Sequence, residues 1–407
     1  MLKMPFMLYA NVTILPCLIF FFFWPYPGFE SDIGTFGAWA YRLNAVPLGE
    51  FYQKEYFCDY FPAYLYVLKF LGWFANLVQL PLHGPGSQLL LKAPALVAHI
   101  IMMIQISYFR EPLFKGFDLS DQKLGFAIIF CSLWPAQIQN IVFFGQCDAV
   151  FNLIAFNYIC ALRWNKLGKS ALLWGLLCSF KPLAILLLPF TMFSFYWYPK
   201  LRSLRSVIYF TVVSFITILS LHAPFWIDKP WQDFLDHLLN TSRSYPFATV
   251  NAFNLYFLMG LNWLPIDSSK FMGMPLAAIW LLAFGIYMMF ATYLLTIKRE
   301  DKKSDTLLFL LSTLGILILF MTLPKMHERY LMPIFPMFIP VFVYSRLTSL
   351  CFLLVGICLA LNQQIIVEFY SPLKIPFDAH LANFCGYCYL LVILALIIES
   401  IRSTRKT

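Results

Sequence analysis

Apolar residues in this chain gather in runs of roughly 20 positions, separated by shorter polar or charged segments. Because an α-helix rises about 1.5 Å per residue, a run of about 20 residues can cross the hydrocarbon core of a bilayer. A membrane β-barrel would instead show short strands that alternate apolar and polar residues, whereas a run such as 307–323 is almost continuously apolar. The pattern therefore predicts an all-α membrane protein.

We expect about twelve transmembrane helices in a single domain that covers residues 1–407. Their approximate positions are 7–24, 88–108, 124–143, 149–164, 206–225, 274–296, 307–323, 331–345, 348–367 and 385–400, with two short spans within 170–198. The stretch 170–198 is divided because Lys181-Pro182 interrupts it, and proline breaks a helix. The first run follows Lys3 and lacks a small-residue cleavage site, which favours an uncleaved first helix.

Lysine and arginine residues provide an independent test of this threading, because short cytoplasmic loops of membrane proteins are enriched in them. With the N-terminus inside, most of the 29 Lys and Arg residues fall in cytoplasmic segments, so both termini are predicted to be cytoplasmic. Two long stretches, 25–87 and 227–273, remain outside, and we expect structured loops there because neither is of low complexity. The aromatic-rich segment 60–80 is suited to lying along the membrane surface.

The composition agrees with a membrane protein: 61% of the residues are hydrophobic and 12% are charged, which excludes a water-soluble domain of 407 residues. We attribute the net charge of +9 to cytoplasmic lysines and arginines, and we find no nucleic-acid-binding motif. Cys385 and Cys388 form a CxxC pair at the start of a predicted helix. Core packing is their expected role, and a metal or redox pair is the alternative.

The unusual polar residues share the external side of this topology. Asp32 follows the first span, Asp59 lies in the first loop, and Asp148 follows the third span. Lys181 lies at the break between two short spans, and the turn 325–329 joins two later ones. An ionisable residue in a membrane helix costs about 2.5–3.5 kcal/mol, so Asp148 and Lys181 require partners or a water-filled cavity. They either pair with each other to join helices or line a cavity suited to proton transfer beside an anion.

Asp32 is the residue that we expect to act as a general base. A short carboxylate at the root of the external loop can reach a hydroxyl group near the membrane surface. The alternative is that Asp32 caps the helix that follows the Pro-Tyr-Pro-Gly turn. Asp59, which precedes an aromatic-proline sequence, has a similar ambiguity.

Lys325, His327 and Arg329 place three nitrogen-bearing side chains within five positions. They lie on the external face, against the trend that retains lysine and arginine in the cytoplasm. Arginine can bind a phosphate through two parallel hydrogen bonds, so this turn is a candidate anion clamp. A salt-bridge cluster centred on Glu328 is the alternative.

Several short motifs occur in order along residues 29–340. They include Ser31-Asp32-Ile33, Asp59-Tyr60-Phe61-Pro62, Gly145-Gln146-Cys147-Asp148-Ala149, Phe180-Lys181-Pro182, Asn251-Ala252-Phe253-Asn254 and Met326-His327-Glu328-Arg329-Tyr330. This ordered set resembles the GT-C glycosyltransferases, particularly bacterial relatives of the mannosyltransferase that adds the second mannose to glycosylphosphatidylinositol anchors. The chain departs from the family pattern at Phe61-Pro62, where paired prolines are usual, and at Cys147, but neither departure touches an acid or base.

The resemblance implies a GT-C fold and an inverting glycosyltransferase on the external face. Its donor would be a polyprenyl-phosphate-linked sugar, mannose or another hexose, and its acceptor a lipid, a glycan or a protein. Asp32, which matches the acid in the family's first loop, would deprotonate the acceptor hydroxyl. The other matched residues are expected to bind substrate: Asp59, Tyr60, Gln146, Asp148, Lys181, Asn251, Asn254, Lys325, His327 and Arg329.

No cofactor is required by this interpretation, because a cationic clamp can replace a divalent ion, although Asp32 with Asp59 or Asp148 could bind a metal. The resemblance favours a bacterial inner membrane, or the endoplasmic reticulum for a eukaryotic source. The chief alternative is a transporter or lipid flippase, whose ionisable residues should gather near the bilayer midplane. An inactive GT-C homologue that acts as a scaffold is a third interpretation.

Overall fold

The computed structural model of the chain describes residues 6–53, 56–114, 120–227, 229–271, 273–298, 305–371 and 374–405. Several positions that contribute to the cytoplasmic charge pattern lie outside these residues: Lys3, Lys115, Arg299, Lys302, Lys303 and Lys406. The described part consists of helices with two small two-stranded sheets.

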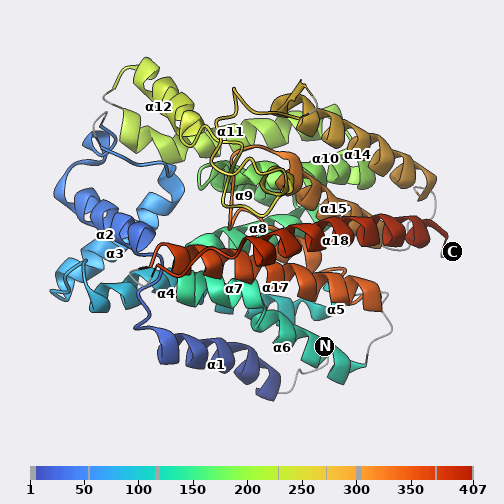
Figure 1. The fold of residues 1–407 in the computed structure, drawn as a ribbon, viewed down its shortest axis with the longest axis horizontal. Helices are drawn as coiled ribbons and strands as arrows, with labels where there is room; N and C mark the ends of the chain where they lie inside the picture. The colour runs from blue at the N-terminus through green and yellow to red at the C-terminus, as the bar shows by residue number, and fades with distance from the viewer. Residues whose placement is uncertain are drawn as a thin grey trace.

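Long apolar helices form the body of the molecule (Figure 1). Their bounds are α1 (Phe6–Phe23), α4 (Pro85–Tyr108), α6 (Asp121–Ser132), α8 (Asp148–Arg163), α9 (Leu167–Cys178), α10 (Leu188–Trp197), α11 (Leu204–Trp226), α14 (Leu276–Lys298), α15 (Thr306–Thr322), α17 (Arg346–Phe369) and α18 (Ala379–Arg405). In the described part, 6 helical stretches are long and apolar enough to cross a membrane: Gly86–Tyr108, Asp121–Phe144, α11, α14, α17 and α18. The chain is therefore an all-α membrane protein.

Shorter elements connect these helices. They are α2 (Glu30–Ala45), η1 (Leu48–Glu50), α3 (Pro62–Leu77), α5 (Arg110–Leu113), α7 (Pro135–Ile138), the π-helical η2 (Gln139–Phe144), η3 (Pro182–Leu187), η4 (Pro199–Leu201), α12 (Trp231–Arg243), α13 (Leu255–Leu258) and α16 (Ile334–Phe338). The strands are β1 (Thr249–Val250), which pairs in parallel with β4 (Met326–His327), and β2 (Lys270–Phe271), which pairs antiparallel with β3 (Met274–Pro275). As the sequence predicts, the helix ending at Cys178 stops before Lys181-Pro182.

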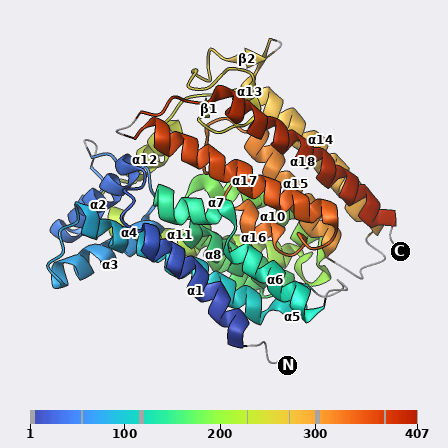
Figure 2. The ribbon, with the colours of Figure 1, turned by 60° about the horizontal axis from the view of Figure 1, so that its bottom comes forward.

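Helices α2, α3 and α12 lie together at one end of the molecule, and α18 ends at the other (Figures 1 and 2). Side chains tie α2 to α3: Asn44 donates a hydrogen bond to the carbonyl of Lys69 at 3.0 Å, and Lys69 donates to the carbonyl of Leu43 at 2.7 Å. Helix α3 buries one apolar face and exposes the side chains of Phe70 and Trp73 on another. The segment 25–87 is thus structured, as the sequence predicts.

The segment 331–345 differs from the expected transmembrane helix. It contains the single short helix α16, with turns on either side. The reason is Pro333, Pro336 and Pro340, because each proline lacks a backbone N–H and disfavours the preceding residue's helical conformation. Irregular backbone is tolerated at membrane depth only where protein covers it, and every residue from 331 to 342 is buried.

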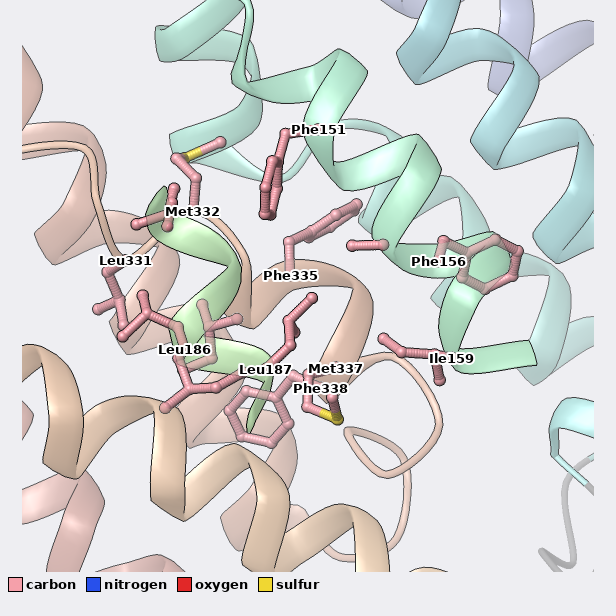
Figure 3. Packing of buried hydrophobic residues seen from close by; sticks show 14 of the residues in the cluster. Phe151, Phe156, Ile159, Leu186, Leu187, Leu331, Met332, Phe335, Met337 and Phe338 are labelled. Atoms are coloured by element: carbon pink, nitrogen blue, oxygen red, sulfur yellow. The ribbon is translucent and has the colours of Figure 1, made fainter. Parts of the chain in front are cut away.

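The cover over this irregular segment comes from α8 and η3. Figure 3 shows Phe335 and Phe338 packed beside Phe151 of α8 and Leu187 of η3. A dense apolar core thus holds the turn that precedes α16, and this turn contributes side chains to the polar site described below.

Trp134 fixes the helical stretch 121–144 against α17. Its indole is fully buried and stacks on Phe335 and Phe352, with ring centroids 4.9 and 5.3 Å apart, and its Nε1 donates to the carbonyl of Phe352 at 3.0 Å. Gly356 is required for this approach, because a Cβ atom there would lie 2.3 Å from the indole nitrogen. The π-helical η2 at the end of the same stretch is therefore held in place.

Cys385 and Cys388 are buried free thiols on α18. Their burial agrees with the expected role in core packing.

Candidate active site

The start of α2 is anchored to the end of the stretch 121–144. Buried Lys92 donates hydrogen bonds to the carbonyls of Tyr26 at 2.6 Å and Val142 at 2.9 Å, which joins the two segments. The backbone N–H of Phe29 also donates to the carbonyl of Phe144 at 2.8 Å. These bonds fix the first turn of α2, and with it the side chain of Asp32, relative to the motif that begins at Gly145.

Gly145 follows the π-helix η2 and reverses the chain toward α8. Its φ of +81° lies in the left-handed region, and a Cβ atom there would lie 2.6 Å from Cδ1 of Ile33. Both the conformation and the close approach of α2 therefore require glycine. Short π-helical segments are frequent at functional sites, and here the segment directs Gln146 and Asp148 toward Asp32.

Asp32 does not cap α2. The N-cap residue is Phe29, which has no side-chain capping bond, and Asp32 lies in the first turn of the helix. Its carboxylate instead accepts a hydrogen bond from Nε2 of Gln146 and lies 3.5 Å from a guanidinium nitrogen of Arg329. With its side chain 23% exposed, Asp32 is the accessible acid beside a buried cation. The capping interpretation is wrong for this residue.

Asp148 and Lys181 form a buried ion pair. Nζ of Lys181 lies 2.7 Å from Oδ1 of Asp148, and Nδ2 of Asn140 donates to the other carboxylate oxygen at 3.1 Å. The side chains of Asp148 and Lys181 are only 1% and 7% exposed. Of the two interpretations of these residues, mutual pairing between helices is the arrangement that the structure contains.

Tyr60 and Gln146 connect this ion pair to Asp32. The ammonium of Lys181 lies 4.8 Å from the ring centroid of Tyr60, within the range of a cation–π interaction. The hydroxyl of Tyr60 donates to Oε1 of Gln146 at 3.3 Å, and Gln146 donates in turn to Asp32. Residues from three separate sequence segments are therefore in contact: Tyr60, Gln146 and Lys181.

Arg329 is the centre of the charged cluster. Its guanidinium pairs with the carboxylate of Glu328 and lies 3.5 Å from Asp32 and 4.0 Å from Asp148. The sequence offered a salt-bridge cluster centred on Glu328 as the alternative to an anion clamp. The ion pair between Arg329 and Glu328 is present, and Arg329 also lines a cavity. Nε of Arg329 is buried and has no hydrogen-bond partner among the described residues.

His327 differs from a cationic clamp residue. Burial lowers the pKa of its imidazole well below the usual value, and the positive charges of Arg329 and Lys181 lower the pKa further. The Glu328 carboxylate, 3.9 Å away, does not reverse this effect. His327 is therefore neutral and offers one N–H donor rather than a positive charge.

The sheet of β1 and β4 joins the long loop 227–273 to the turn that carries the cluster. Val250 pairs with His327, and the backbone N–H of Lys325, whose φ is +65°, donates to the carbonyl of Ala248 at 3.1 Å. Asn251 also forms an antiparallel bridge with His327. The loop expected to be structured thus completes one wall of the site.

Of the two asparagines in the motif 251–254, Asn251 lines a cavity and Asn254 does not. Asn251 lines a cavity beside the cluster, and its Oδ1 accepts hydrogen bonds from Asn262 and from the indole of Trp263 at 3.1 and 2.9 Å. Asn254 is fully buried, caps α13 by accepting from the N–H of Phe257 at 3.1 Å, and donates to a carbonyl of α15. The structure does not bring Asn254 to the cavities that surround the cluster.

Two cavities adjoin the cluster. The central chamber, of about 520 Å³, is bounded by the carboxylate-bearing start of α2 and by the turn that contains Arg329. The lateral cavity, of about 430 Å³, is lined by Asp59, Lys325 and apolar residues of η3 and the α15 end. His327 and Tyr245 line both cavities and separate them.

Tyr245 and Trp263 are cavity residues that the sequence did not single out. Tyr245 has a φ of +57° and lies edge-on to the imidazole of His327, with ring centroids 4.9 Å apart. Both aromatic residues lie in the loop 227–273, outside the short motifs. Because the chain is rich in aromatic residues throughout, no sequence signal distinguishes these two.

The titration of Asp32 provides a test of its role. Burial raises the pKa of this carboxyl, and the charges of Arg329 and Lys181 oppose the rise without cancelling it. A general base must be deprotonated, so kcat/KM for a reaction that uses Asp32 should fall as pH decreases through a midpoint above about 4, the usual value for aspartate.

Arg329→Gln should move this acidic limb further up the pH scale, because it removes a charge that lowers the pKa of Asp32. A pH–rate profile that stays flat below pH of about 4 would contradict the assignment of Asp32.

Among the described residues, no group of three or more His, Cys, Asp and Glu side chains is arranged to hold a metal ion. Asp32 and Asp148 instead both face Arg329.

No family model matches the sequence, and a search of curated proteins finds no match. The site therefore has to be interpreted from its own geometry.

Proposed function

We propose that this protein is a GT-C-type glycosyltransferase that moves a hexose from a polyprenyl-phosphate donor to an acceptor hydroxyl. The observation that carries the proposal is the contact between the accessible Asp32 carboxylate and buried Arg329 at the wall of a 520 Å³ chamber. A base and a cation a few ångströms apart suit a reaction in which a proton leaves one reactant while negative charge develops on the other.

The chemical step follows from these positions. Asp32 accepts the proton of the acceptor hydroxyl, and the oxygen attacks the anomeric carbon of the donor from the side opposite the phosphate. The bond between the anomeric carbon and the phosphate oxygen breaks, the phosphate leaves with the electron pair, and the configuration inverts. Arg329, whose guanidinium borders the chamber, stabilises the negative charge, and His327 can donate one N–H.

The lateral cavity fits the lipid end of the donor. Leu183, Ile185 and Leu323 provide an apolar lining, while Lys325 and His327 lie at the same cavity. A polyprenyl phosphate likewise has an apolar part, the isoprenoid chain, next to a charged part, the phosphate. His327 and Tyr245 line both cavities, so the phosphate would lie between the lateral cavity and the sugar in the central chamber.

Lys181 has a different role in this proposal from the one that the motif resemblance implies. Its charge is already paired with Asp148 inside the protein, so it contributes to the electrostatic field near Tyr60 and Arg329 rather than binding phosphate directly. Asp59 lies at the lateral cavity, where burial raises the pKa of its carboxyl.

The proposed topology has twelve crossings, with both termini in the cytoplasm and the cluster on the external face. The buried, proline-interrupted segment 331–345 supplies the tenth crossing, and α9 and α10 with η3 supply two short ones. The family resemblance favours a bacterial inner membrane. It also favours mannose as the transferred sugar.

A lipid or sugar transporter is the alternative function. Its ionisable residues should lie near the bilayer midplane on broken helices that belong to inverted repeats. The break at Lys181 is one such feature, but the charged cluster contacts α2 and β1, both of which belong to the external loops of the proposed topology. An inactive scaffold is not favoured either, because the candidate base retains access to the chamber.

Mass spectrometry of the lipids that co-purify with the protein tests donor binding. Wild-type protein should retain a polyprenyl phosphate or its glycosylated form, and Arg329→Gln should retain about tenfold less, since a charged hydrogen bond contributes about 1.5–3 kcal/mol. Lys200→Gln, which changes an exposed residue at a predicted cytoplasmic loop, is the matched control. Equal recovery of polyprenyl phosphate from wild type and Arg329→Gln would contradict the role given to Arg329.

A further inference from the structure

A third cavity, separate from the two at the charged cluster, lies between α2, the end of α3 and the start of α4. We call it the α2 groove. Its volume is about 690 Å³, and residues that line it include Glu30, Gly34, Tyr41, Asn76, His83 and Gln88. The proposed reaction assigns no role to this groove.

Glu30 lines both the groove and the central chamber, so the two cavities adjoin at the first turn of α2. Glu30, Gly34 and Tyr41 repeat at helical spacing and therefore share one face of α2. Asp32 projects from a different face of the same helix into the chamber. Because successive helical residues are about 100° apart, Asp32 lies on nearly the opposite side of α2 from Gly34, and a molecule in the groove reaches the chamber around the first turn of the helix, at Glu30.

The charge of the groove differs from that of the two cavities at the cluster. The central chamber contains Arg329 and the lateral cavity contains Lys325, whereas the described residues that line the groove include no lysine or arginine. Glu30 adds a negative charge at the rim. Apart from the imidazole of His83, the described lining therefore offers a phosphate group no basic partner, and Glu30 would repel it.

The polar groups of the groove are suited to hydroxyl groups. Asn76 and Gln88 carry amides that both donate and accept hydrogen bonds, and Glu30 adds an acceptor. The Oε1 atom of Gln88 is buried and has no hydrogen-bond partner among the described residues. Tyr41 is 68% exposed and presents an aromatic ring, an apolar face suited to the C–H face of a sugar.

We infer that the α2 groove binds the neutral saccharide headgroup of the acceptor and presents one of its hydroxyls to Asp32. This inference rests on the proposed glycosyl transfer. Donor and acceptor then enter from different sides: the phosphate from the lateral cavity, which Lys325 and Asp59 both line, and the neutral sugar from the groove, whose described lining contains no lysine or arginine. The acceptor class is a neutral glycan or glycolipid headgroup rather than a phosphorylated one or a peptide.

Gly34 allows a direct binding test, because a Cβ atom at this position would meet no atom within 4 Å. Gly34→Cys in lipid nanodiscs can therefore be labelled with a charged maleimide without disturbing the packing. Dodecyl maltoside, kept below its micellar concentration, provides a neutral disaccharide headgroup. Dodecyl phosphate carries the same chain with an anionic headgroup. Ser268→Cys, on an exposed loop away from the groove, is the control for general effects of either amphiphile.

At about four times its dissociation constant, dodecyl maltoside should slow labelling of Gly34→Cys about fivefold by mass action. Dodecyl phosphate should leave this rate unchanged, and neither probe should affect Ser268→Cys. If Gly34→Cys fails to fold, Ala38→Cys, which lines the same groove and is exposed, gives the same comparison. Equal protection by the two probes, protection by the phosphate alone, or no protection would each overturn the inference.

The outcome also separates this inference from the proposed function. Protection by maltoside in a protein that shows no glycosyl transfer would support a saccharide-binding groove and contradict the enzyme. Transfer without protection would support the enzyme and contradict the groove.

Discussion

Asp32→Asn should reduce sugar transfer by about 10²- to 10⁴-fold, the usual contribution of a general base. Asparagine preserves the shape of the side chain and can still accept the hydrogen bond from Gln146, but its amide cannot take the acceptor's proton. Donor binding should be nearly unchanged, because Arg329 keeps its pair with Glu328. Initial rates with radiolabelled donor, together with recovery of bound lipid, measure the two quantities separately.

The matched control is Asp121→Asn, since Asp121 also lies in the first turn of a helix but is exposed and outside the cavities described above. It should retain wild-type activity. Near-normal transfer by Asp32→Asn would remove Asp32 from the role of general base. The same substitution at Asp59 and Asp148 would then identify the acid that acts instead.

Lys181→Met should destabilise the protein by about 3–5 kcal/mol, because it leaves the buried carboxylate of Asp148 without its cation. The double variant Asp148→Asn with Lys181→Met should recover most of this loss. It removes both charges while preserving their volumes, and Asn140 keeps its second hydrogen bond, to Gln363 at 2.9 Å. Denaturant or thermal unfolding of the purified variants measures the effect.

Lys169→Met is the control for the loss of a lysine, since Lys169 is exposed on the helix that leads to Lys181. It should change stability by less than about 0.5 kcal/mol. If Lys181→Met and the double variant are equally stable, the two charges are not coupled. Lys181 would then be available to bind phosphate, as the motif resemblance implies.

The sequence predicts the helical class and much of the site because the relevant signals are local. Runs of apolar residues identify the long helices, and the cost of burying charge singles out Asp148 and Lys181. Asp32, Gln146 and Arg329 lie far apart along the chain, yet the external side assigned by the charge pattern is sufficient to group them. Their proximity in the fold agrees with that grouping.

Three features depend on packing that no local pattern records. The irregular segment around α16 requires knowledge that α8 and η3 cover its backbone, which hydropathy alone does not contain. The neutrality of His327 follows from burial beside Arg329. The capping role of Asn254 depends on where α13 begins, and the motif that contains Asn254 does not specify this.

The most direct test of the account is transfer by the purified protein in nanodiscs. The assay supplies radiolabelled mannose linked to polyprenyl phosphate as the donor and neutral membrane glycolipids as acceptors. A parallel assay in proteoliposomes follows the movement of a fluorescent polyprenyl phosphate across the bilayer. With wild-type protein we expect the label to appear in a glycosidic product, and with Asp32→Asn we expect no labelled product. Neither protein should accelerate lipid movement. Accelerated lipid movement that survives Asp32→Asn, with no labelled product from any hexose donor, would contradict glycosyl transfer and favour a transporter.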